Sequence, residues 1–147
     1  YPMLSPDGRW LAYASNESGT YEIYVRAFPE ATSGGGKWQI SSGGGAYPMW
    51  SRSGRQLFFE NLDNRVMVTA YTVQGSSFVA EKPRPWSERQ LANLVNASKN
   101  IDLAPDGKRF AVILPVEETG ANQARSRVTY IENFFDELRR KAPVGKK

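Results

Sequence analysis

The sequence predicts an all-β fold built from a repeated antiparallel unit, and three observations support this prediction. Aromatic residues, which favour strands over helices, make up 12% of the 147 residues. Gly (13 residues) and Pro (nine residues) are spread along the chain, as frequent tight turns require. A segment of two short apolar runs joined by a turn occurs at residues 1–13, again at 47–59 and more loosely at 100–112.

Each copy of this segment predicts a β-hairpin. In the first copy the turn is Ser-Pro-Asp-Gly at residues 5–8, where Pro presets φ, Asp bonds its own backbone and Gly takes a positive φ. The runs after the turns, at residues 10–14, 56–60 and 109–114, are rich in strand-forming residues. The second copy lacks the Pro and Asp of the turn but keeps its Gly, at position 54.

The repeat length predicts more than a hairpin. The turn glycines Gly8, Gly54 and Gly107 are 46 and 53 residues apart, which suits a four-stranded propeller blade. We therefore expect an all-β partial β-propeller of about three four-stranded antiparallel blades with a short C-terminal helix. The expected blades cover residues 1–46, 47–99 and 100–132, and the helix and a basic tail cover residues 133–147.

The other strands are predicted from alternating runs. In the first unit we expect strands at residues 21–28 and 37–41. In the second unit we expect a third strand at 66–73, an extension or further strand at 76–80, a Pro-rich connection at 81–88, and an outer strand or helical turn at 91–95. In the third unit we expect a strand at 127–131 and a helix with Asn133 as its N-cap.

The chain contains neither Cys nor His. A Ser-His-Asp triad, a Cys-His pair and a Cys/His zinc site are therefore excluded within it, and we predict no catalytic residue, cofactor or metal ligand. The carboxyls of Asp7 and Asp106 occupy the same position in two turns, so we interpret them as turn residues and not as a paired-carboxylate site. Asp63 and Asn64 are interpreted in the same way.

Neither a nucleic-acid site nor a membrane segment is predicted. The Gly-Gly-Gly-Lys run at residues 34–37 lacks the spacing and the following helix of a phosphate-binding loop. Aromatic residues alternate with Arg in residues 24–28, which is more simply explained by one buried and one exposed face of a strand. No stretch reaches the roughly 18 apolar residues that a membrane-spanning helix needs.

The chain resembles TolB-type, WD-repeat-like β-propellers. The resemblance rests on the Ser-Pro-Asp-Gly-Arg turn at residues 5–9, the strand Glu-Ile-Tyr-Val-Arg-Ala-Phe-Pro at 22–29 and the run Gly-Gly-Lys-Trp-Gln-Ile-Ser at 35–41. It is nearest to the C-terminal propeller of acidobacterial serine/threonine protein kinases. The resemblance implies a sensor or scaffold in the periplasm or elsewhere outside the cytoplasm.

Three blades do not close a ring, because propellers usually have about four to eight. We therefore expect a homodimer in which two copies supply six blades, or association with blades that this sequence lacks.

The expected binding site is the mouth of the propeller channel, for a protein partner or a small ligand. Five residues on the innermost strands are predicted to line it: Tyr1, Tyr47, Trp50, Asn100 and Asp102. The alternative is that Trp50 and Leu4 pack between blades.

The expected function is non-catalytic protein–protein interaction or ligand sensing. The alternative is a substrate-gating propeller of a prolyl oligopeptidase-like serine peptidase whose catalytic domain lies elsewhere. A peptidase propeller should run into an α/β domain, whereas this chain is expected to stop after a capped helix, which favours the first function.

Overall fold

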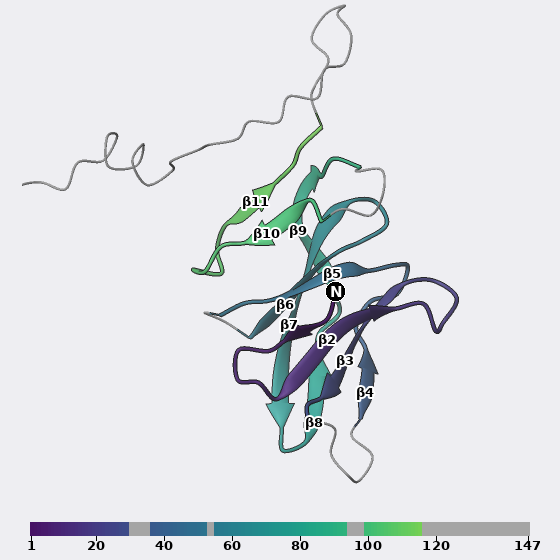
Figure 1. The fold of residues 1–147 in the computed structure, drawn as a ribbon, viewed down its shortest axis with the longest axis vertical. Helices are drawn as coiled ribbons and strands as arrows, with labels where there is room; N and C mark the ends of the chain where they lie inside the picture. Colours follow the sequence, from purple (N-terminus) through teal and green to yellow (C-terminus); the bar gives the residue numbers. More distant parts are fainter. Residues whose placement is uncertain (30–35, 53–54, 94–98, 116–147) are drawn as a thin grey trace, which may run out of the picture. The chain divides into compact units, whose positions relative to one another are not determined.

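The computed structural model describes residues 1–29, 36–52, 55–93 and 99–115 of the chain (Figure 1). These residues form strands and turns and contain no helix, so the all-β prediction is confirmed for them. The strand predicted at 127–131 and the helix predicted from Asn133 lie outside the described residues. Among the described segments, none is a helix long and apolar enough to span a membrane.

The first sheet is a four-stranded antiparallel meander in which neighbouring strands follow one another in the chain. The strands are β1 (Met3–Leu4), β2 (Trp10–Ser15), β3 (Glu22–Ala27) and β4 (Lys37–Gln39). The β2–β3 pairing runs unbroken from Trp10 opposite Ala27 to Ser15 opposite Glu22. All three predicted strands after the first turn are therefore confirmed, within one or two residues at their ends.

The second sheet repeats this order and adds a strand. Its strands are β5 (Ala46–Trp50), β6 (Gln56–Glu60), β7 (Arg65–Gln74), β8 (Ser77–Ala80) and β9 (Arg84–Gln90). The long strand β7 pairs with β6 and β9 along its first part and with β8 along its last four residues. The run at 76–80 is thus a separate strand that folds back on β7.

The outer strand of the second unit is where the sequence prediction was wrong. The observed outer strand is β9, which overlaps the predicted Pro-rich connection at 81–88. The described part of the predicted outer strand, Leu91 to Asn93, forms no strand. Pro85 lies opposite Met67 of β7. An edge strand tolerates Pro because one of its sides needs no N–H donors. Pro85 therefore marks an edge strand here and not a loop.

The third unit contributes a hairpin of β10 (Ile101–Leu103) and β11 (Phe110–Val112). Leu103 lies opposite Phe110, in the same register in which Leu4 lies opposite Leu11 in the first unit.

The turns of the first and third hairpins share their hydrogen bonds. The Gly8 N–H donates to Ser5 O at 2.9 Å, and the Gly107 N–H donates to Ala104 O at 2.9 Å. Both glycines have positive φ, +69° and +66°, which residues with a Cβ rarely adopt. Asp7 Oδ1 accepts from the Arg9 N–H, and Asp106 Oδ1 accepts from the Lys108 N–H. The turn roles predicted for the two aspartates are confirmed.

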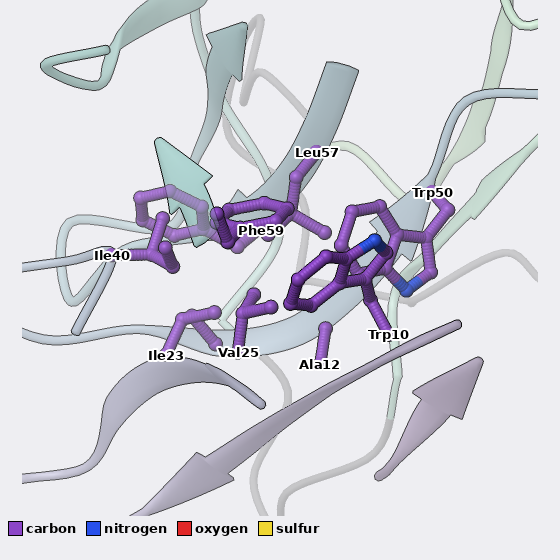
Figure 2. Packing of buried hydrophobic residues seen from close by; sticks show 9 residues of the cluster. Trp10, Ala12, Ile23, Val25, Ile40, Trp50, Leu57 and Phe59 are labelled. Atoms are coloured by element: carbon purple, nitrogen blue, oxygen red, sulfur yellow. The ribbon is translucent and has the colours of Figure 1, made fainter. Parts of the chain in front are cut away.

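Two apolar cores lie on opposite faces of the second sheet. The core toward the first sheet contains Trp10, Ala12, Ile23, Val25, Ile40, Trp50, Leu57, Phe59 and Phe78 (Figure 2). The core toward the third hairpin contains Met49, Phe58, Val66, Val68, Leu91 and Ile101. Alternate residues of a strand point to opposite faces, so β6 supplies Leu57 and Phe59 to one core and Phe58 to the other.

Candidate functional site

The candidate site lies where the first strand of each hairpin begins. Tyr1, Tyr47 and Asn100 occupy equivalent positions there in the three repeats. The rings of Tyr1 and Tyr47 contact each other, with centroids 5.1 Å apart and planes tilted by 58°. Tyr1 is 67% exposed and Tyr47 is half-buried. The two rings, which we call the tyrosine face, therefore offer an apolar contact surface to solvent.

The backbone at Tyr47 is unusual. Its φ is +53°, in the left-handed region, and the β5–β6 register shifts between Ala46 and Met49. A bulge of this kind redirects a side chain, and strained residues of this type collect at functional sites. The bulge thus sets the position of the Tyr47 ring against Tyr1.

A buried polar pair lies close to Tyr47 in the sheet: Glu60, at the end of β6 and opposite Ala46, and Asn100, before β10. Both residues are only 5% exposed. Asn100 Nδ2 donates to Glu60 Oε1 at 3.2 Å and to Ala92 O at 2.8 Å, so both of its hydrogens are used. Glu60 Oε2 and Asn100 Oδ1 are inaccessible to solvent, and neither has a hydrogen-bond partner in the part of the chain that the structure describes.

The pKa values around the pair reflect this burial. Desolvation raises the pKa of Glu60, and the hydrogen bond from Asn100 opposes that rise. Burial also raises the pKa of Tyr47, with smaller contributions from Coulomb interactions with Tyr1 and Glu60. Tyr47 and Glu60 are thus close enough for the charge of one to affect the other.

A second buried glutamate, Glu22 on β3, differs from Glu60 in that both of its side-chain oxygens accept hydrogen bonds. Ser41 Oγ donates to Glu22 Oε2. The N–H groups of Gly43 and Gly44 donate to Glu22 Oε1 at 2.8 Å and 2.9 Å. Glu22 therefore holds the loop before β5 in place by accepting three hydrogen bonds, and both of its oxygens are partnered.

The five residues predicted for the site do not all meet. Tyr1 and Tyr47 do, whereas Asn100 is hydrogen-bonded to Glu60, whose charge contributes, together with burial, to the raised pKa of Tyr47. Trp50 is instead buried in the core, as its packing alternative states, and its Nε1 donates to Met3 O at 2.9 Å. Asp102 faces outward and pairs with Lys99 at 2.8 Å. Leu4, offered as a packing residue, is 47% exposed.

Glu60 is the member of the site that sequence reasoning missed. It ends the run Gln-Leu-Phe-Phe-Glu, in which the last four residues are all buried. A carboxylate that closes such a run is unusual, because a buried charge is costly unless it is paired. That cost is the sequence signal that could have identified it.

No described cluster of three or more acidic, Cys or His side chains could hold a metal ion. The arrangement offers one exposed and one half-buried tyrosine ring, and a buried acid–amide pair lies close to Tyr47. No family model, curated protein or solved structure matches the chain.

Proposed function

We propose that this chain is a segment of a β-propeller that serves as a non-catalytic binding module, with the tyrosine face as part of its contact surface. The observation that carries the proposal is a backbone hydrogen bond that recurs at the same position in all three hairpins. The N–H groups of Ser5, Ser51 and Ala104 each donate to the carbonyl oxygen five residues further along the chain, at 2.8, 3.0 and 2.8 Å. Equivalent hairpins at this spacing are typical of successive blades.

The first two sheets support the same proposal. Each continues its hairpin with further antiparallel strands, and the sheets pack face to face through one apolar core. In such an arrangement the first strand of every unit is innermost, and the residues that begin those strands surround the channel. Tyr1, Tyr47 and Asn100 hold that position in the three units.

The composition of the site favours a protein partner. Tyrosine supplies a large contact area at low cost in side-chain entropy and is enriched where proteins meet. On this proposal the parent protein is TolB-like or kinase-linked, and the chain binds an exposed peptide segment of a partner across Tyr1 and Tyr47.

A selection from a displayed library of random peptides tests this proposal. The full chain is the target, and the recovered peptides are then measured against the Tyr47→Ala variant. Losing the ring is expected to weaken binding by at least about tenfold, as truncating an aromatic anchor does. Tyr21→Ala is the matched control, because Tyr21 is also an exposed tyrosine, at 58%, but lies before β3.

Peptides that bind wild type and Tyr21→Ala equally, but Tyr47→Ala weakly, support the proposal. Peptides that bind all three proteins equally contradict it. A selection that enriches no peptide also contradicts the proposal that the partner is a protein.

A further inference from the structure

The unpaired atoms of Glu60 and Asn100 have complementary needs. A neutral carboxylic acid carries one O–H donor and a carboxylate carries none, whereas the Asn100 side-chain oxygen can only accept. The two groups already share one hydrogen bond, from Asn100 Nδ2 to Glu60 Oε1. The atoms left over are one oxygen of each group, Glu60 Oε2 and Asn100 Oδ1.

We propose that Glu60 and Asn100 form a proton-dependent latch: on taking up a proton from solvent, Glu60 donates its Oε2–H to Asn100 Oδ1 while Asn100 Nδ2 continues to donate to Glu60 Oε1. The protonated pair is a cyclic acid–amide pair with two parallel hydrogen bonds. It gives both buried acceptors a partner without any other molecule. This inference does not depend on the proposed binding function.

A proton explains the unpaired atoms better than a ligand does, because neither atom is accessible to solvent. A bound molecule would have to displace protein atoms to reach them, whereas a proton adds no volume. The raised pKa of Glu60, caused by desolvation, agrees with a site that favours the neutral acid.

The titratable and charged groups on the described surrounding elements have other partners and do not supply a hydrogen bond to Glu60 Oε2 or Asn100 Oδ1. Burial and, to a smaller extent, the charge of Glu60 raise the pKa of Tyr47 on β5, so the Tyr47 hydroxyl stays neutral in the pH range where a carboxyl titrates. Lys99, beside Asn100, is paired with Asp102 of β10. Arg65, at the start of β7, is paired with Glu88 of β9. Tyr1 contacts the ring of Tyr47.

The latch would control how firmly the third hairpin is attached to the second sheet. Asn100 Nδ2 also binds Ala92 O, Asn100 O accepts from the Ile113 N–H, and the Ala92 N–H donates to Ile113 O. Asn100 is therefore the centre of a hydrogen-bond network that joins β6, the segment after β9 and the end of the hairpin. A second bond between Asn100 and Glu60 strengthens that network when the pH falls.

The direct test is a pH titration of the full chain by NMR, observing the side-chain carbonyl carbons of Glu60 and Asn100. The latch predicts a Glu60 midpoint above that of an ordinary glutamate. It also predicts that the Asn100 Cγ signal shifts with the same midpoint, because Asn100 Oδ1 gains its hydrogen bond at that step. A Glu60 midpoint at the ordinary value, or an Asn100 signal that does not follow it, overturns the proposal.

A pair of isosteric variants provides a second, independent test. Glu60→Gln supplies an N–H in place of the acid O–H and removes the buried charge, so Tm at pH 7.5 should rise, by about 4 °C if one hydrogen bond is gained. Because protonation also neutralises wild-type Glu60, this advantage should shrink as the pH falls through the raised pKa of Glu60.

Glu22→Gln is the matched control, since Glu22 is equally buried at 5% but accepts from three donors. Gln has one side-chain oxygen in place of two, so at least one of the three donors loses its present acceptor oxygen and Tm should fall. A Glu60→Gln variant that melts below wild type at pH 7.5, as Glu22→Gln is expected to, contradicts the latch. If Glu60→Gln does not fold, the wild-type titration decides the question alone.

Discussion

The rings of Trp10 and Phe78 lie with their centroids 5.2 Å apart and join the first sheet to the second. Both side chains are 2% exposed, and Trp10 begins β2 while Phe78 belongs to β8. Phe78 also contacts the rings of Trp38, Trp50 and Tyr71. It is thus the centre of an aromatic cluster drawn from both sheets.

We expect Phe78→Ala to be among the most destabilising single changes in the described part of the chain. Removing a buried phenyl ring loses its transfer free energy and leaves a cavity, which together cost about 3–5 kcal/mol. The free energy of unfolding, from urea denaturation followed by tryptophan fluorescence, measures this loss. Val79→Ala, at the next position and 48% exposed, should change it by less than about 1 kcal/mol. Similar losses for the two variants would contradict the assigned core.

We expect acid to weaken the first turn through Asp7. The Ser5 hydroxyl, which donates to Asp7 Oδ1 at 2.6 Å, is the largest cause that lowers the pKa of Asp7. A lowered folded-state pKa gives stability that is present above the unfolded-state pKa and is lost as the pH falls through the folded-state pKa. Because Asp7 is exposed, the contribution should be below about 1 kcal/mol.

The Asp7 prediction is checked by measuring unfolding free energy against pH for wild type and Asp7→Asn. In Asp7→Asn the unfolding free energy should fall less as the pH is lowered, because the contribution of Asp7 is already absent. Ser5→Ala should reduce the same part, since it removes the main cause of the shift. An unchanged pH profile in both variants would show that this turn does not contribute.

The left-handed backbone of Tyr47 predicts that Gly is more stable than Ala at this position, the reverse of the usual order in a strand. At φ +53° a residue with a Cβ is strained by about 1–2 kcal/mol, whereas Gly is not. Tyr47→Gly should therefore be more stable than Tyr47→Ala by about 1 kcal/mol, although Gly is ordinarily the more costly residue in a strand. Urea denaturation of the two variants measures the difference. A more stable Ala variant would contradict the assigned backbone conformation.

Exposed apolar residues at both ends of the described part predict that copies of the chain associate. Met3 and Leu4 of β1 are 41% and 47% exposed, and Ile113 and Leu114 after β11 are 49% and 40% exposed. Light scattering over a concentration series should give a mass near twice the 16.4 kDa of one chain. Ile113→Glu should shift the mass toward the monomer, while Thr20→Glu in an exposed loop should not. A wild-type monomer at all concentrations would contradict the prediction.

The parts of the fold that depend on local chemistry could be predicted from the sequence. The turns at Asp7 and Asp106 follow from short-range hydrogen bonds and glycine conformation, and the strands after them follow from alternation. The contact of Tyr1 with Tyr47 could be anticipated because the two occupy equivalent positions in adjacent repeats.

The parts that depend on long-range pairing could not be predicted in the same way. Strand β9 contains Pro85, and only its place at a sheet edge makes that residue acceptable. The burial of Trp50 could not be predicted either, because alternation does not tell which face of a strand meets a neighbouring sheet. Glu60 and Asn100 are 40 residues apart, so their pairing requires the packing of the third hairpin.

Because β6 supplies residues to two cores, a shift in its pairing register is especially costly. Phe58 and Phe59 are adjacent, yet each serves a different core. A slip of β6 by one residue against β5 and β7 would exchange the two faces and place the Glu60 carboxylate where Phe59 now packs. Misalignment of this strand is therefore penalised twice, once in each core, so insertions or deletions within it should be tolerated far less than substitutions.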